Sequence, residues 1–598
     1  MNMEKCKYLL FCGTLALWMA GSFQQVYAAT EPSSQAIQQQ SNKVTGKVSD
    51  ATGPIIGASV VEKGTANGTI TDLDGNFSLN VKVGATLVVS YVGYKSEEVK
   101  AGRGPLNITL KEDAKALDEV VVTALGIKRE RKALGYGIDE VKGEALTKAK
   151  ETNLINSMAG RVPGLVVSQT AGGPSGSTRV ILRGSTEMTG NNQPLYVVDG
   201  VPLDNTNFGS AGTNGGFDLG DGISSINADD VENMSVLKGP AASALYGSRA
   251  SHGVILITTK RGAEGKAKVS FSTSAGVNVR TKDLEFANSY QYASYYNMMK
   301  VNDGGVATFS DEQLETFRNH SNPLMYPDIN WIDYCMNKAA FQSQHNVNIS
   351  GGTSNMKYFV SAGLFTQGGM FKQFNATDDF NFDYKRYNYR ANLDFDVTKT
   401  TLLSVNIGGR IETKRTPESG EDQNQLFRKL YWAVPFAGAG IVNGERVVSN
   451  SEVLPFTGVD GLSSYYGKGF QTKTTNVLNV DLALNQKLDF ITKGLSVKLK
   501  GAYNSEYANT KKASSSKAYY TPVANADGSI SLRKYGTDSQ LSYGEPDNGF
   551  SKARNWYMEL ALNYARKFGD HNVTALLLYN QSKKYYPSEY SDIPTGYV

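Results

Sequence analysis

The side chains that most often carry out chemistry are few in this chain and lie far apart in the sequence. There are four histidines, and none has the His-Glu-x-x-His or paired spacing typical of zinc ligands. The sequence has no Gly-x-Ser-x-Gly elbow for a nucleophilic serine and no phosphate-binding loop. We therefore predict that the protein is not an enzyme and uses no metal or cofactor. We expect the histidines at turns or on the surface, at His252, His320, His345 and His571.

Two charged motifs each have an ordinary explanation. In TDLDGNF, Asp72 and Asp74 have the spacing of calcium ligands, but the next ligand position is Gly75 and the twelfth is Val83 instead of glutamate. We therefore predict a hairpin turn there. The basic run KRERK at 128–132 is interpreted as a solvated linker, and a net charge of +4 gives no indication of a nucleic-acid partner.

The stretch LDEVVVTALG at 117–126 is a strong β-forming run between two charged segments. Two interpretations stay open from the residues alone. The run closes the β structure that precedes it, or it is a free strand that a partner protein captures by adding it to the edge of a sheet. A free strand must be unpaired to be captured, so its isolation would be a requirement of the second interpretation.

The N-terminus has the pattern of a secretory signal. Lysines precede the apolar run YLLFCGTLALWMAG, and small residues follow at 28–29, so we predict a signal peptide over 1–29. The remaining chain holds one cysteine, Cys335, and can form no internal disulfide. No later stretch approaches the about 18 consecutive apolar residues of a membrane helix, so any membrane-spanning structure must be β.

Three patterns follow one another along the chain. Short strand-like runs with turn signals every eight to twelve residues predict a small Ig-like β-sandwich over 43–112. From 130 to 262 the pattern predicts an α+β domain, with a helix over 142–160 that buries Leu146, Leu154, Ile155 and Met158. Its strands are expected in STRVILRG, PLYVVDGVPL, VENMSVLKG and GVILITTKRG.

From 266 to 598 apolar and polar residues alternate over long runs, as in RYNYRANLDFDV and NWYMELALNY. These runs exceed the length of most globular strands, and tight turns alternate with long connections at about 279–341, 415–472 and 509–553. This combination predicts the first part of a large antiparallel transmembrane β-barrel. About nine strands are expected, near 266–278, 342–351, 355–368, 384–398, 400–414, 473–490, 494–508, 554–568 and 570–583.

The phrases GPIIGASV and GTITDLDGNFSL resemble the carboxypeptidase-regulatory-like domain of many Bacteroidetes outer-membrane receptors. LDEVVVTALGIKRE, GRVPGLVV, PLYVVDGVP and VLKGPAASALYGSRASHGVILITTKRG resemble the SusC/RagA family of TonB-dependent outer-membrane transporters. The resemblance implies a mainly β fold in which the α+β domain is a plug inside the barrel. Nine strands are far fewer than the about 22 of large plugged transporters, so we expect the chain to be an incomplete or truncated form.

The resemblance also implies roles for individual residues. It makes the valine run a TonB box, which consists of Asp118, Glu119, Val120, Val121, Val122, Thr123 and Ala124. Other residues would seat the plug, by pairing with wall carboxylates or the plug backbone or by permitting tight turns. They are Arg183, Gly184, Asp199, Gly200, Lys238, Gly239, Tyr246, Gly247, Arg249 and Gly253.

The implied function is import of nutrients, preferably oligosaccharides, across the outer membrane. The implied partners are TonB with ExbB and ExbD, a SusD-like surface lipoprotein and outer-membrane lipid, with the TonB box and sandwich in the periplasm. Import of peptides, iron chelates or cobalamin, and a surface glycan-binding protein without transport, remain alternatives. Cargo contacts are sought in 205–218 and at Tyr465 and Tyr466, although ordinary loop packing explains these tyrosines equally well.

Overall fold

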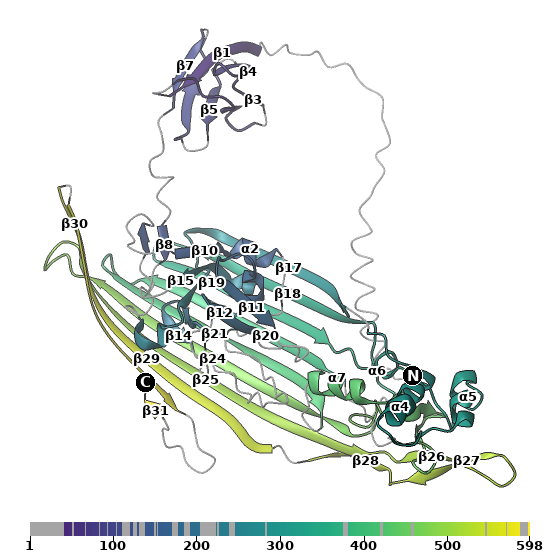
Figure 1. The fold of residues 1–598 in the computed structure, drawn as a ribbon. Helices are drawn as coiled ribbons and strands as arrows, with labels where there is room; N and C mark the ends of the chain where they lie inside the picture. The colour runs from purple at the N-terminus through teal and green to yellow at the C-terminus, as the bar shows by residue number, and fades with distance from the viewer. Residues whose placement is uncertain are drawn as a thin grey trace, which may run out of the picture. The chain divides into compact units, whose positions relative to one another are not determined.

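The computed structural model confirms the mainly β fold class (Figure 1). The described residues up to 110 form one compact unit, and those from Val120 onward form a second. The signal peptide predicted over 1–29 lies outside the described residues. The structure describes residues 41–50, 53–65, 67–82, 84–91, 94–102, 104–110, 120–122, 128–130, 138–148, 151, 153–169, 178–184, 192–203, 223, 226–238, 246–281, 284–374, 381–418, 423–455, 460–544, 547–569, 571–585 and 596–597.

The first unit is a β-sandwich with one shared core. A three-stranded sheet in the order β4-β1-β7 faces a four-stranded sheet in the order β3-β2-β5-β6. Val48, Phe77 and Ile108 of the first sheet pack with Val60 and Val89 of the second, and all five are buried. The strands are β1 Ser41–Ser49, β2 Ser59–Glu62, β3 Gly68–Ile70, β4 Asn76–Lys82, β5 Thr86–Ser90, β6 Glu97–Lys100 and β7 Leu106–Thr109.

The acidic motif of this unit is a turn between β3 and β4, as predicted. Asp72 Oδ1 accepts hydrogen bonds from the backbone N–H groups of Asp74, at 3.0 Å, and Asn76, at 2.7 Å. The Asn76 bond lowers the pKa of Asp72 because it stabilises the carboxylate. The carboxylate therefore serves the backbone of its own turn.

The α+β domain has a five-stranded sheet in the order β10-β15-β16-β13-β14 and a two-stranded sheet, β11-β12. The predicted helix over 142–160 is wrong as a single element, because α2 and η3 are separate and Asn153 caps η3 by accepting from the Ile155 N–H at 3.1 Å. The four predicted apolar residues are nonetheless buried together in its core. The elements are β10 Ile138–Lys142, α2 Gly143–Thr147, η3 Leu154–Met158, β11 Leu165–Gln169, β12 Thr178–Leu182, β13 Leu195–Val198, β14 Val201–Leu203, η5 Ala228–Asp230, β15 Val231–Leu237, η6 Gly247–Ala250 and β16 Val254–Thr259.

Nine long antiparallel strands form one curved sheet, as predicted (Figure 1). Each pairs with the next long strand along the chain, and two short strands, β28 Ser539–Tyr543 and β31 Gly596–Tyr597, pair with β25 and β30. We call this sheet the wall. The long strands are β17 Gly265–Val279, β18 Ala339–Gly352, β19 Met356–Gly368, β20 Asp383–Asp396, β21 Thr401–Pro417, β24 Gly469–Lys487, β25 Leu495–Ser516, β29 Asp547–Phe568 and β30 His571–Tyr585.

The two faces of the wall differ in chemistry. Tyr387, Leu482 and Leu560 are among the large apolar side chains exposed on one face, whereas Asn388 and Asp481 are buried on the other. An apolar band outside and a polar surface inside is the pattern of a membrane-spanning β wall. Among the described residues, every helix is too short or too polar to cross a bilayer.

Three long connections of the wall fold into a helical and β-sheet layer at one end of the strands (Figure 1). Tyr465 and Tyr466 are buried there, with exposed fractions of 0% and 6%, so the surface role considered for them is wrong and the packing alternative holds. The elements are α4 Ser289–Asn302, α5 Asp311–Asn319, α6 Trp331–Cys335, α7 Gln423–Trp432, β22 Gly438–Val442, β23 Glu445–Val448, β26 Tyr519–Ala524 and β27 Ile530–Tyr535.

Candidate functional site

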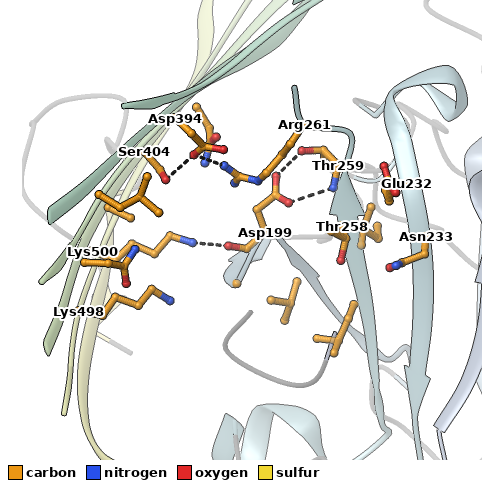
Figure 2. A pocket seen from close by; sticks show the side chains of 18 of the residues that line it. Asp199, Glu232, Asn233, Thr258, Thr259, Arg261, Asp394, Ser404, Lys498 and Lys500 are labelled. Carbon is orange, nitrogen blue, oxygen red and sulfur yellow. Dashed lines mark hydrogen bonds and ion pairs between the residues drawn. The ribbon is translucent and has the colours of Figure 1, made fainter. Parts of the chain in front are cut away.

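The α+β domain contacts the polar face of the wall around a cavity of about 640 Å³ (Figure 2). Strands β13, β15 and β16 of the domain line one side, and β20, β21, β24 and β25 of the wall line the other. Both sides contribute charged residues, such as Asp199 and Arg261 from the domain and Asp394 and Lys500 from the wall. The cavity therefore marks an interface between two parts of one chain at which charged groups meet, beside apolar contacts such as that of Val201 with Ala502 and Tyr557.

Asp199 lies at the tight turn between β13 and β14 and connects three elements. Its backbone is left-handed, with φ of 48°, and the following Gly200 has φ of 85°. Its carboxylate accepts from the Thr259 N–H at 3.0 Å and from Thr259 Oγ1 at 2.7 Å, which ties the turn to β16. Its backbone carbonyl accepts a hydrogen bond from Lys500 Nζ of the wall. Asp199 thus links the β13–β14 turn to β16 within the domain and anchors the domain to β25 of the wall.

The end of β16 is held by β20 through directional contacts. Asn392 Nδ2 donates to Thr259 Oγ1 and to the Lys260 carbonyl, both at 2.8 Å. Arg261 Nη1 pairs with Asp394 Oδ1 at 2.7 Å, and Ser404 Oγ donates to the same oxygen at 2.5 Å (Figure 2). Because hydrogen bonds to charged groups are stronger than neutral ones, Arg261 and Asp394 contribute much of the hold at this end.

A second polar cluster joins η5 to the wall. Asn227 Nδ2 donates to Asn346 Oδ1 at 2.6 Å, and Asn346 Nδ2 donates to Asp229 Oδ2. Asp230 lies 3.6 Å from Arg390 Nε. Burial raises the pKa of Asp230, and the Arg390 guanidinium opposes that shift. We call the contacts of these five residues the η5 latch.

The predicted seating residues divide into two groups by location. Asp199, Gly200 and Tyr246 line the interface cavity, and Arg249 lines a second cavity of about 320 Å³ beside Tyr557 of β29. Lys238 instead bonds within its own domain, to the Pro163 carbonyl at 2.8 Å and to Asp139. Gly239 lies outside the described residues.

The remaining seating residues shape turns of the domain. Arg183 and Gly184 are exposed and left-handed, with φ of 60° and 88°, and the Arg183 N–H donates to the Gly164 carbonyl at 2.8 Å. Gly247 and Gly253 also have positive φ, 69° and 92°. A Cβ on Gly253 would lie 2.4 Å from Leu182 Cδ2 and 3.0 Å from the Leu237 carbonyl, whereas one on Gly247 would meet nothing within 4 Å.

These two glycines provide a matched pair of variants. Gly247→Ala is expected to lower the free energy of unfolding by about 1–2 kcal/mol, because it adds only the strain of a left-handed alanine. Gly253→Ala is expected to lower it by a further 1–3 kcal/mol or so, because the added methyl group also overpacks the core against β12 and β15. Urea unfolding of the two purified variants measures the difference, and equal losses would contradict the packing argument.

Sequence reasoning missed most of the wall's contribution. The alternation in RYNYRANLDFDV places Arg390, Asn392 and Asp394 on the polar face of β20, but alternation shows only which way a side chain faces and not what it meets. Arg261 lies in TTKRG, which the resemblance included without assigning a role to it. Alternation therefore marks the three β20 residues as candidates for such contacts without identifying their partners.

The valine run is paired locally in the structure. Val120–Val122 form β8, which pairs antiparallel with β9, Lys128–Glu130, through three residue pairs. The expectation of an unpaired strand is therefore wrong for these three residues. The other members of the proposed TonB box, Asp118, Glu119, Thr123 and Ala124, lie outside the described residues.

Among the described residues, no group of three or more His, Cys, Asp or Glu side chains could hold a metal ion. The charged side chains of the interface instead pair with each other or with backbone groups. The arrangement can hold one part of the chain against another.

Comparison with known proteins identifies both domains. Residues 44–122 match the CarboxypepD_reg-like domain, and residues 131–254 match the TonB-dependent Receptor Plug Domain. A plug domain in polar contact with a wall of long antiparallel strands defines a TonB-dependent receptor. Within that class, the two domain matches and the sequence similarity to SusC support the SusC/RagA type.

Relatives of this type match over long stretches. TonB-dependent receptor SusC of Bacteroides thetaiotaomicron is 34% identical over 406 residues, which cover 65% of this chain and 37% of SusC. TonB-dependent receptor P39 of Formosa agariphila is 28% identical over 562 residues, covering 92% of this chain and 47% of P39. The RagAB peptide importer in its open-open state has a similar fold, with a TM-score of 0.53 and 18% sequence identity. The match covers 79% of this chain and 51% of the RagAB chain. The chain thus spans about half the length of these relatives or less.

Proposed function

We propose that the protein imports a nutrient across the bacterial outer membrane, powered by TonB with ExbB and ExbD and assisted by a SusD-like surface lipoprotein. In this proposal 1–29 is a signal peptide, and the sandwich at 43–112 and the TonB box at 118–124 lie in the periplasm. The domain at 130–262 is the plug, and 266–598 is part of the barrel. Family membership supports this assignment, and the polar interface between plug and wall is the observation that carries it.

A polar interface suits a plug that must move. Each contact of Asp199, Arg261 and the η5 latch joins groups that water can also satisfy, so separation exchanges one hydrogen bond for another. A wholly apolar interface would instead expose hydrophobic surface to the solvent-filled lumen. Intact, the contacts keep the plug in place, and under force they can break one at a time.

The pairing of β8 with β9 suits capture by a partner. Three residue pairs form a ribbon too short for independent stability, so replacing β9 by a longer strand of another protein costs little. Strand addition grips the main chain of the valine run. A pull on this segment then acts on the plug, whose first described strand begins at Ile138.

The deciding experiment compares uptake by the full-length protein with and without residues 118–124. We expect loss of uptake on deletion, and we expect a deletion of equal length at 111–117 to leave uptake intact. Radiolabelled neutral oligosaccharides, uncharged peptides and ferric siderophores serve as cargo, and uptake of one class identifies it. Unchanged uptake without 118–124 would contradict the proposal and favour a surface glycan-binding protein.

Oligosaccharides are the preferred cargo, and peptides are the second candidate. A peptide cargo has support from the RagAB peptide importer, whose fold this chain shares. Ferric siderophores have weaker support, because the siderophore receptor PirA of Acinetobacter baumannii is 29% identical over only 242 residues, 38% of this chain.

A further inference from the structure

The layer formed by the long connections contains a small pocket outside the plug interface. It has a volume of about 250 Å³ and lies between the segment before α4, the start of α6 and the end of α7. We call it the rim pocket. Its volume is below the about 300–1,000 Å³ of pockets that enclose a drug-sized ligand, so it has room for a single ring and not for a whole oligomer.

The floor of the rim pocket is rigid. Trp331 and Leu430 are 2% and 3% exposed and belong to the main buried cluster of this layer. Trp331 Nε1 donates to the Val434 carbonyl at 2.9 Å, which fixes the indole in one orientation.

The rim, in contrast, exposes large aromatic rings. Trp432 is 65% exposed, Phe286 39% and Tyr431 36%. Phe286 and Tyr431 pack edge to face with centroids 5.4 Å apart, and the Arg428 guanidinium lies 5.1 Å from the Trp432 ring centroid. These contacts hold the rings in place while they remain open to solvent, so a ligand finds preformed aromatic faces.

The lining of the rim pocket carries no charged side chain. Its residues are aromatic, aliphatic or neutral polar, and its side-chain polar groups include the Tyr292 and Tyr431 hydroxyls and the Trp432 indole N–H. The Asn330 amide is bonded to Asp333, and the Trp331 indole N–H to the Val434 carbonyl. Burial raises the pKa of Tyr292, so its phenol stays neutral at physiological pH. A phosphate, a carboxylate or an ammonium group would enter this pocket without a partner charge, at a cost in desolvation.

We propose that the rim pocket binds one uncharged pyranose ring of an oligosaccharide. A pyranose has an apolar C–H face that can stack on an aromatic ring, and hydroxyl groups around its edge that bond to neutral donors and acceptors. An aliphatic peptide side chain would contact the rings but offer no hydrogen bond to the Tyr292 and Tyr431 hydroxyls or the Trp432 N–H. The assignment rests on the proposed function, because it names the cargo class of that importer.

The test is binding to the purified full chain in detergent, measured by isothermal titration calorimetry. The probes are maltohexaose and xylohexaose as neutral sugars, trigalacturonate as a charged sugar, and an uncharged pentapeptide. We expect a neutral sugar to bind. Trp432→Ala is expected to weaken its binding about tenfold or more, which corresponds to about 1.4 kcal/mol, and Trp432→Phe is expected to restore most of the loss because it keeps a ring.

The matched control is Tyr295→Ala, which removes a ring that is 66% exposed on α4 and outside the rim pocket. We expect it to leave sugar binding unchanged. Equal affinity of Trp432→Ala and wild type, binding of the peptide alone, or no binding of any neutral sugar would each overturn the assignment. Binding needs no TonB, so a failure here is distinguishable from a failure of the deletion at 118–124, which is scored by uptake.

Discussion

Tying residue 227 of the plug to residue 346 of the wall is expected to abolish uptake, and release of the tie is expected to restore it. Asn227 and Asn346 are 4% exposed each, and their side chains are hydrogen-bonded at 2.6 Å across the η5 latch. With Asn227→Cys and Asn346→Cys, a short bis-methanethiosulfonate reagent can replace this bond by a covalent bridge that is joined to each thiol through a reducible disulfide. A hydrogen bond yields to force and re-forms, but a covalent bridge does not yield, so the plug can no longer leave the wall.

The measurement is uptake before cross-linking, after cross-linking and after reduction, in the full-length protein. The control pair is Asn156→Cys with Thr178→Cys, which replaces a hydrogen bond of 2.7 Å that lies wholly within the plug. Its cross-link is expected to leave uptake intact. The natural Cys335 does not interfere, because burial raises the pKa of its thiol to about 12 and keeps it protonated and unreactive. Uptake that survives the tie between 227 and 346 would show that this part of the plug stays on the wall.

The wall was predictable from the sequence because its signal is repeated. Every long strand alternates apolar and polar residues, and a tilted strand in a bilayer must be long, so pattern and length pointed to the same nine strands. The observed strand ends differ most from the predicted ones at β25 and β29. Strand β25 extends to Ser516, beyond the predicted 508, and β29 begins at Asp547, before the predicted 554. The end of β25 pairs with β28 and leads into the layer of the long connections, where packing within that layer replaces the alternation of the wall.

The loops were not predictable in the same way, because exposure in a loop depends on contacts between distant segments. Tyr465 and Tyr466 lie in a polar, glycine-rich stretch, yet they are buried against Phe371 and α6. The exposed aromatic residue is Trp432, which ends an amphipathic helix and looks like a core residue by its spacing. Composition identified aromatic-rich loops but not which rings face solvent.

The plug site was predictable in part. The VVDG motif identified Asp199 and Gly200, and the left-handed backbone of both residues explains why a short polar residue and a glycine occupy the turn. Lys500 and Asn392 escaped prediction because they lie 301 and 133 residues along the chain from their plug partners. No local pattern carries information about such a pairing, which exists only once the wall curves around the plug.

Lys500→Met is expected to lower the free energy of unfolding by about 3–5 kcal/mol, because it removes the main counter-charge of the buried Asp481 carboxylate. Lys500 is 3% exposed, donates to the Asp199 carbonyl, and interacts electrostatically with Asp481, which is 9% exposed. Methionine has a similar length but offers neither charge nor donor. Both the turn at Asp199 and the Asp481 carboxylate then lose a partner in a site that water reaches poorly.

Urea unfolding of the detergent-solubilised chain measures this loss, with Lys493→Met as the matched control. Lys493 is an exposed residue of the turn before β25, and its change is expected to stay within about 0.5 kcal/mol. The double variant Lys500→Met with Asp481→Leu is expected to recover most of the stability, because it removes both charges from the interior. If the double variant is as unstable as the single one, the cost comes from the lost bond to Asp199, and the charge pair is of minor importance. In either case uptake by the double variant reports on seating, since the plug then rests on the wall without its anchor at β25.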